Sequence, residues 1–219
     1  MNSTLSGTLS EQLYLVLRRK ILAGEYPPAY HLREVSIAHE FQTSATPVRE
    51  AIRRLTQEGL IETERYRGAV VKSYNVEEFL HLYQIREILE IPAARLAVTQ
   101  VTEAGIVYIQ EVIDQSEEAL FAQDAQALMS LDLTFHERLV NAAGNPMLSG
   151  ISRGIHEKLQ TIRKMTIPAS IVGDQSHAEH KRILADLQRR DAEAIADHLT
   201  NHIRRNQAEV LAYLQASED

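Results

Sequence analysis

The stretch LREVSIAHEFQTSATPVREAIRRLTQEGL, residues 32–60, decides the fold of the first part of this chain. Its first half has apolar residues at helical spacing, and this narrow stripe is formed by Val35, Ala38 and Phe41. After a polar interruption, Ser44 is in position to cap a second helix. Pro47 falls in the first turn of that helix, where a missing amide hydrogen costs little. The stretch therefore predicts two short helices joined by a tight connection.

The predicted second helix has two faces of different character. Apolar residues recur at i, i+3, i+4 and i+7 and form its buried face, which consists of Val48, Ala51, Ile52 and Leu55. Thr46, Arg49 and Arg53 share another face, and Gly59 supplies a natural stop. An apolar back and a Thr/Arg front at the start of a second helix are what entry into a DNA major groove requires.

The flanking residues complete a winged helix-turn-helix. Upstream, residues 10–24 have the apolar spacing of one more helix. Downstream, residues 60–64 and 69–72 are expected to form two short strands, which the basic tip at residues 65–68 joins as a hairpin. The alternative is a small helical domain with incidental arginines, and the sequence favours it less.

This part of the chain resembles the DNA-binding domain of GntR-type transcriptional regulators over about residues 9–72. The resemblance is carried by Leu32, Glu34, Ala38, the run TPVREA at residues 46–51, Leu55, Gly59, Leu60 and Gly68. At two DNA-contacting positions this chain has Val35 and Ala45 where family members carry Arg. DNA contact is therefore expected to depend on the remaining positions, which are Arg33, Ser44, Thr46, Arg49, Arg53, Arg67 and Gly68.

Composition narrows the class of protein. The 219 residues contain no cysteine, which excludes disulfides and thiolate metal sites. No run of about 18 apolar residues occurs, and the polar start MNSTLSGTLSEQ lacks the pattern of a secretion signal. A cytoplasmic protein without a membrane span is the expectation.

The net charge of −7 is unevenly distributed. Residues 1–74 contain ten Lys and Arg against eight Asp and Glu, whereas residues 75–219 contain thirteen against twenty-two. A mildly basic first part, residues 1–74 (the head), and an acidic second part, residues 75–219, fit DNA contact through the head alone. Because one weakly basic head binds DNA poorly, we expect a homodimer that uses two heads on double-stranded operator DNA.

Residues 75–219 predict an all-α bundle of six or seven helices. The fold class is therefore mostly α, with a winged helix-turn-helix domain at residues 1–74 and a helical bundle at residues 75–219. No pattern of alternating apolar residues competes with helix in this second domain.

Three predicted helices of the bundle carry histidines beside their apolar stripes. Asp132 and His136 are four residues apart and project from one face, while His180 and His202 lie on two other helices. A divalent cation would compensate a carboxylate buried there and would accept neutral imidazoles. The alternative is a hydrogen-bonded polar core, and His177 or His198 could take the place of a neighbouring histidine.

The bundle is similar to the FCD effector-binding domain of the FadR-like branch of GntR regulators, on the segments LDLTFHERLVNAAGNP and EHKRILADLQRRDAEAIADHLTNHI. In metal-binding members, four positions of this pattern coordinate the ion. They match Asp132, His136, His180 and His202 here, whereas members that respond to long-chain acyl-CoA lack the set. The resemblance implies a divalent ion (Zn, Ni, Mn or Fe) with open positions for a small carboxylate. Arg86 and Arg163 are the candidates for a second contact with this effector.

These features predict a ligand-responsive transcriptional regulator that senses a small organic acid. The resemblance favours repression, although no residue separates a repressor from an activator. The alternative is a metal-dependent enzyme with a DNA-binding head, since an open metal position can activate water. No HExxH or comparable motif supports it, and Glu137 and Glu179, adjacent to ligands in sequence, are expected to point away from them.

Overall fold

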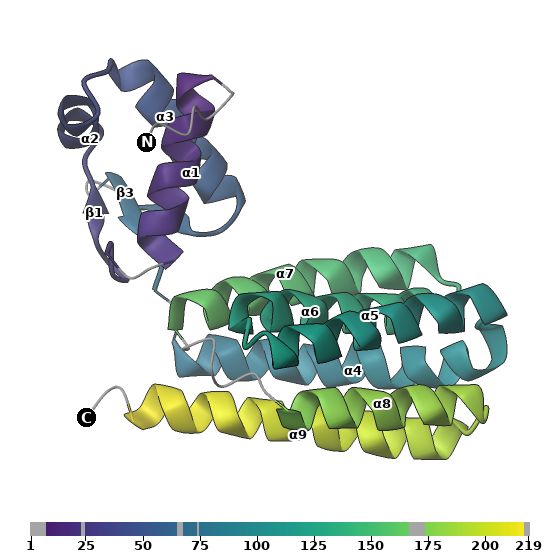
Figure 1. Ribbon diagram of the computed structural model, residues 1–219. Coiled ribbons are helices and arrows are strands. Elements are labelled where there is room, and N and C mark those ends of the chain that lie inside the picture. The colour runs from purple at the N-terminus through teal and green to yellow at the C-terminus, as the bar shows by residue number, and fades with distance from the viewer. Residues whose placement is uncertain (1–7, 23–24, 65–67, 74, 167–173, 217–219) are drawn as a thin grey trace. The chain divides into compact units, whose positions relative to one another are not determined.

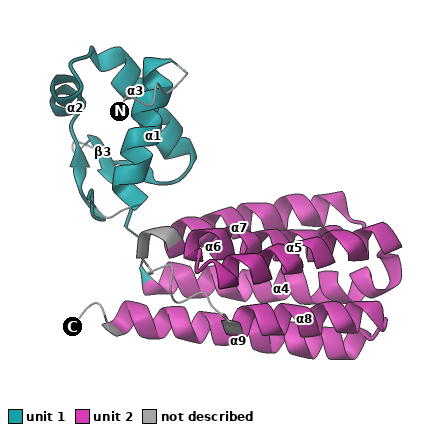
Figure 2. Cartoon of the chain, viewed as in Figure 1, with its two compact units in different colours: residues 1–75 teal, residues 76–219 magenta. Residues whose placement is uncertain are grey.

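The computed structural model describes residues 8–22, 25–64, 68–73, 75–166 and 174–216 (Figure 1). The chain divides into two compact units, residues 1–75 and residues 76–219 (Figure 2). Among the helices that the structure describes, none combines the length and the apolar character that a membrane span requires.

The described part of the first unit consists of three helices and a small sheet. The helices are α1 (Leu9–Leu22), α2 (Glu34–Glu40) and α3 (Ala45–Gln57), and the strands are β1 (His31–Leu32), β2 (Ile61–Glu64) and β3 (Gly68–Val71). All pairs are antiparallel and the order is β1-β3-β2, so β3 is central. The hairpin of β2 and β3 is the predicted wing. The two-residue strand β1 was not predicted, because it is too short to show alternation.

The core of the first unit lies between α1 and α3. The predicted face of α3 is buried, and α3 packs against α1, whose buried residues include Leu13 and Leu17. The predicted stripe of α2 was wrong in one position, because Val35 is 80% exposed. The buried face of α2 is centred on Ile37 and Ala38, and Val35 lies about 200° around the helix from Ile37.

Six helices form the described part of the second unit, as predicted. They are α4 (Val76–Gln100), α5 (Glu103–Phe121), α6 (Ala125–Asn141), α7 (Pro146–Thr166), α8 (Asp174–Gln188) and α9 (Ala192–Ala216). Helix α4 packs against α6, α7 and α9, and α5 packs against α6 and α8. In Figure 1, α4 and α9 run side by side along the bundle.

Side-chain caps fix where the helices of the bundle begin. The Thr102 hydroxyl accepts a hydrogen bond from the Gly105 amide at the start of α5, and the Asp124 carboxylate accepts one from Ala127 at the start of α6. Helix α6 ends before Gly144, whose φ of 68° is in the left-handed region. These starts and stops set the rotation of α6, and with it the direction in which its polar residues point.

Polar side chains collect in the middle of this otherwise apolar bundle. The buried members are Arg86 and Glu90 on α4, Asp132 and His136 on α6, His156 and Arg163 on α7, His180 on α8, and His202 on α9. Buried polar and charged groups are stable only with partners. Five helices therefore meet at one polar centre.

Candidate metal and effector site

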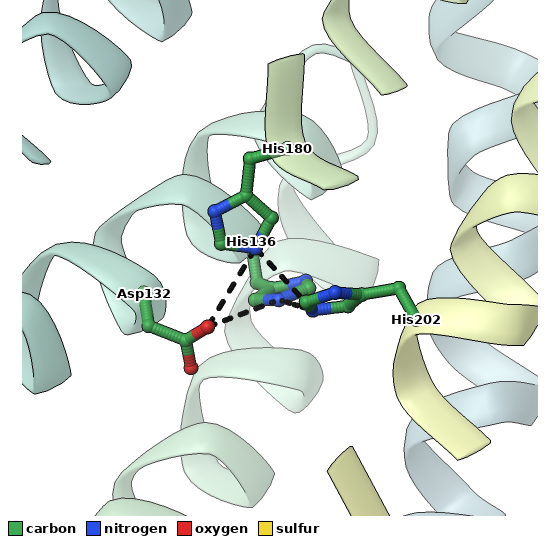
Figure 3. Close-up of side chains that lie close together, drawn as sticks. All are labelled: Asp132, His136, His180 and His202. Carbon is green, nitrogen blue, oxygen red and sulfur yellow. Dashed lines mark hydrogen bonds and ion pairs between the residues drawn. The ribbon is translucent and has the colours of Figure 1, made fainter. Parts of the chain in front are cut away.

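Asp132, His136, His180 and His202 come together at this centre, as Figure 3 shows. One potential ligand atom from each residue lies within 4.8 Å of all the others, and all four side chains are buried. The two residues of α6 project together because they are four apart. The rings of Phe135 and His180 stack with centroids 3.8 Å apart, which orients the His180 imidazole.

The distances between these atoms fit an ion at their centre. His136 Nε2 and His180 Nε2 lie 3.1 and 3.3 Å from His202 Nε2, and 3.9 and 3.6 Å from Asp132 Oδ1. Metal–nitrogen bonds of about 2.1 Å place adjacent ligand atoms roughly 3.0–3.4 Å apart in octahedral or tetrahedral geometry. The four atoms therefore need only small shifts to coordinate one ion.

Carboxylates fix the tautomers of two of the histidines. His136 Nδ1 lies 2.7 Å from Glu90 Oε2, and His202 Nδ1 lies 2.7 Å from Glu179 Oε2. An ionised carboxylate only accepts hydrogen bonds, so each Nδ1 carries the hydrogen and each Nε2 keeps a lone pair. A metal-ligating histidine commonly donates its other ring N–H to a carboxylate in this way.

The electrostatics hold the ligands in the forms that bind a cation. Burial, and then the nearby Arg86 charge, lowers the pKa of His136 to about 4, and burial lowers the pKa of His180 well below its ordinary value. Burial alone would raise the pKa of Asp132, but Arg163 and the imidazoles hold it well below its ordinary value. The cluster therefore offers neutral imidazoles at His136 and His180 and an ionised carboxylate at Asp132.

The hydrogen bonding of the Asp132 carboxylate also favours a bound metal ion. Asp132 Oδ2 accepts a hydrogen bond from Arg163 Nη1 at 2.6 Å, but the buried Asp132 Oδ1 has no hydrogen-bond partner among the described residues. A buried carboxylate oxygen without a partner is costly. A divalent ion between the four residues would complete its coordination, so the donor set and the geometry suit the ion that the sequence predicted.

The two alternative histidines lie elsewhere in the bundle. His198 is partly exposed and its Nδ1 is 2.6 Å from Asp186 Oδ2, so this pair joins α9 to α8. His177 is buried with its Nε2 3.8 Å from Glu117 Oε1 on α5. Neither belongs to the group of four.

A cavity of about 20 Å³ adjoins Asp132 and His136. It is lined by Arg86, Met129, Asp132, Leu133, His136, His156, Leu159, Gln160 and Arg163. Both predicted effector arginines are therefore buried at the cavity rather than placed on the surface. Each is paired with a carboxylate, since Arg86 Nε lies 2.6 Å from Glu90 Oε1 and Arg163 contacts Asp132.

Glu90 and His156 are central to the site, although the sequence did not predict a role for either of them. Glu90 Oε1 also lies 2.6 Å from His156 Nε2, so one carboxylate accepts hydrogen bonds from Arg86, His136 and His156. Burial would raise the Glu90 pKa, but these three neighbours hold it well below its ordinary value. His156 and Arg163 are two turns apart on α7, and this spacing was the sequence signal that could have indicated that His156 shares a face with Arg163.

The expectation for Glu179 was wrong. Its position next to His180 directs it away from that residue, but it reaches the far nitrogen of His202 on α9. Arg205 Nε and Nη2 donate to the same carboxylate at 2.8 and 2.7 Å. Burial would raise the pKa of Glu179, but the hydrogen bonds from His202 and Arg205 lower it to about 2. Glu179 therefore orients a candidate ligand through its second ring nitrogen.

The predicted DNA-binding residues that the structure describes are exposed on the first unit. Ser44 is the N-cap residue of α3, without a side-chain cap bond, and Thr46 is exposed in the first turn. Arg49 Nε and Nη2 lie 3.1 and 2.7 Å from the two carboxylate oxygens of Glu34 on α2. Arg53 pairs with Glu50 within α3.

The remaining predicted contacts flank these. Arg33 is exposed at the N-cap position of α2. Gly68 begins β3 with a φ of 79°, a left-handed conformation that favours glycine. Arg67 lies outside the described residues.

Two family models match the chain, one on each unit. Residues 9–71 match the model described as bacterial regulatory proteins, gntR family, and residues 81–205 match the FCD domain. The chain is a GntR-family regulator with an FCD domain. The winged helix-turn-helix fold and the helical effector domain are thus confirmed.

Curated relatives of this GntR regulator are transcriptional regulators too. It is 25% identical to the HTH-type transcriptional repressor RspR of Escherichia coli, over 96% of this chain and 92% of the relative. It is 28% identical to the Nta operon transcriptional regulator of Aminobacter aminovorans, over 81% and 84% of the two chains. The galactonate operon transcriptional repressor of Escherichia coli is 25% identical over 84% and 89%. The family and these relatives are DNA-binding regulators, not enzymes.

Solved structures share the fold. A GntR regulator from Rhodococcus sp. RHA1 superposes with a TM-score of 0.72 at 20% identity, covering 93% of this chain and 97% of that chain. A metal-free FCD domain of another regulator superposes with a TM-score of 0.55 at 15% identity, covering 66% and 99%.

Proposed function

We propose that this GntR-family regulator senses a small organic acid beside a divalent ion that Asp132, His136, His180 and His202 hold. The observation that carries the proposal is the arrangement at the polar centre. His136 Nε2 and His202 Nε2, on rings whose Nδ1 atoms face carboxylates, converge there with the unpartnered Asp132 Oδ1. The ion would supply positive charge to this convergence and open coordination positions to the acid.

The charges around the cavity favour an anion. Arg86 and Arg163 are matched by Glu90 and Asp132, so these four buried residues carry no net charge. A divalent ion would add a double positive charge that the buried surroundings do not compensate. A carboxylate in the cavity supplies the missing negative charge, and the arginines offer it directional hydrogen bonds.

The proposed target of regulation is double-stranded operator DNA. Thr46 and Arg49 on the exposed face of α3 would contact base edges, with Arg33, Ser44, Arg53, Arg67 and Gly68 as further contacts. Repression, the activity in the names of two relatives, is the proposed mode. Since operator DNA lies there in bacteria, the regulator would act in the cytoplasm.

We propose a homodimer that uses exposed apolar faces of α4 and α7. Helix α4 exposes Ile85, Ile88 and Leu96, and α7, which packs against it, exposes Met147 and Ile151. Exposed apolar patches commonly mark interfaces. Two glycines of α7, Gly150 and Gly154, have open space where a side chain would stand, so packing within the chain does not require them. A closely approaching second copy would account for both.

The function is tested by measuring operator binding by three forms of the protein. Protein loaded with Zn²⁺, the same protein stripped with a chelator, and the His136→Ala variant would each be titrated with small carboxylic acids. An acid that changes DNA affinity by roughly 5–150-fold only in the metal-loaded wild type is the expected result. An equal response of the stripped protein would place the acid elsewhere.

A further inference from the structure

Asn206 is a buried amide beside the four proposed metal ligands. It lies on α9, four residues after His202, and is 3% exposed. Residues four apart project from the same face of a helix, so the amide follows the imidazole into the polar centre. Its Nδ2 atom lies 3.0 Å from His202 Nε2, the nitrogen that would bind the ion. An uncharged side chain therefore directly contacts one of the proposed ligand atoms.

The amide lies at the separation expected of a further ligand. His136 Nε2 and His180 Nε2 lie 3.1 and 3.3 Å from the same nitrogen of His202. Ligand atoms that are neighbours around one ion lie roughly 3.0–3.4 Å apart when each bond is about 2.1 Å long. The Asn206 amide is thus as close to His202 Nε2 as the two histidines are, although the sequence predicted no amide ligand.

Ser176 allows the amide to present either of its two polar atoms to the polar centre. Ser176 Oγ, on α8, lies 3.3 Å from Asn206 Oδ1 and accepts a hydrogen bond from Arg205 Nη2 at 2.9 Å. A hydroxyl has one hydrogen and two lone pairs, so it can donate to Oδ1 or accept from Nδ2. A half-turn of the amide about its terminal bond exchanges these two atoms. The hydrogen bond to Ser176 therefore persists in both orientations.

The proposed ion would favour one of these orientations. A cation repels an N–H hydrogen that points at it and attracts an amide oxygen. Amide carbonyl oxygens are ordinary ligands of hard divalent ions in proteins. We infer that Asn206 turns its Oδ1 to the ion and serves as a fifth ligand. This inference rests on the proposed function, because it requires the ion at this site.

The consequence is a site that suits a six-coordinate ion. Three imidazoles, one carboxylate and one amide would occupy five positions and leave one for water or the proposed acid. Zn²⁺ commonly takes four ligands in tetrahedral geometry, whereas Mn²⁺ favours six and accepts carboxylate and carbonyl oxygens. Asn206 should therefore strengthen the binding of Mn²⁺ more than the binding of Zn²⁺.

Competition between the full-length protein and a fluorescent chelator measures the affinity for each ion. Asn206→Leu keeps the shape of the side chain without an oxygen. It should bind Mn²⁺ at least roughly ten-fold more weakly than wild type, with a smaller loss for Zn²⁺, since even an outer partner of a ligand is typically worth 10–100-fold. Asn206→Asp supplies an oxygen again and should restore Mn²⁺ binding. The matched control is Asn201→Leu, at an exposed position of the same helix, which should bind both ions like wild type.

The opposite role of the amide would give a change of opposite sign. If Nδ2 kept donating to His202 Nε2, the amide would compete with the ion, and Asn206→Leu would bind both ions more tightly than wild type. Unchanged or tighter Mn²⁺ binding by Asn206→Leu would therefore overturn the inference, and so would a loss that Asn206→Asp does not restore. In both cases ion binding by wild type leaves the proposed function standing, whereas wild-type protein that binds neither ion contradicts both proposals.

Discussion

The Nε2 atoms of His136 and His202 lie 3.1 Å apart in the centre of the helical bundle, although each ring donates its Nδ1 hydrogen to a carboxylate. The two lone pairs therefore face each other inside the protein. The Asn206 amide, 3.0 Å from His202 Nε2, can donate to one of them. A shared cation satisfies both at once and also reaches Asp132 and His180, which is why the metal is central to this account.

Removing the ion should lower the melting temperature of the protein. Its proposed ligands come from α6, α8 and α9, so the ion joins three helices that the unfolded chain does not hold together. An ion at 100 times its Kd stabilises the folded state by about 2.7 kcal/mol, or roughly 5–10 °C for a chain of this size. Thermal unfolding with and without a chelator measures this. A chelator that shifts His136→Ala as much as wild type would contradict the account.

Glu179→Ala should weaken metal binding without removing a ligand. The carboxylate holds the His202 ring in the required tautomer, and loss of such a partner typically costs 10–100-fold in metal affinity. Competition with a fluorescent chelator would give the metal affinity. The matched control is Glu87→Ala, which removes a carboxylate paired with exposed Arg204. Equal affinities of the two variants would exclude Glu179 from orienting the site.

Arg49→Ala should weaken operator binding by roughly ten-fold or more, because a good bidentate base contact is worth ~1–3 kcal/mol. The side chain is 69% exposed, so its pair with Glu34 contributes little to stability and the fold should persist. Gel-shift titration on an operator fragment measures the loss. Arg95→Ala, which breaks a surface pair in the bundle, is the control. A folded Arg49→Ala protein with wild-type affinity would remove this face of α3 from the interface.

Ile88→Glu should dissociate the proposed homodimer. The side chain is 69% exposed on α4, and a charge there would have to be desolvated in the interface. Sedimentation velocity should show a dimer for wild type and a monomer for the variant. Val107→Glu, on an exposed position of α5, should remain dimeric. Monomeric wild-type protein at working concentrations would refute the dimer itself.

The periodic spacing of apolar residues in the sequence predicts the helices of this structure, but it predicts few of the other features. Helical spacing was sufficient to pair Asp132 with His136 and to separate the two faces of α3. It failed at α2, where a seven-residue helix carries too few apolar positions to define a face, so that the predicted apolar stripe included the exposed Val35. Periodicity also cannot show β1, whose two residues are ordered by pairing with β3.

In the candidate site, too, sequence patterns indicate some residues and miss others. The four proposed ligands stand in recognisable patterns, whereas His156 and Glu179 matter only through the way α7 and α9 pack against their neighbours. Glu179 is a residue of α8 that acts on a residue of α9, and no spacing within one helix encodes that contact. The partners of the proposed ligands therefore required the three-dimensional structure.

The metal content of the purified protein tests the central claim most directly. Elemental analysis of protein prepared without chelator should find close to one divalent ion per chain in wild type and in His198→Ala, and far less in His136→Ala. Wild-type protein without bound metal, or a His136→Ala variant that retains it, would show that the four residues are only a polar cluster in the core.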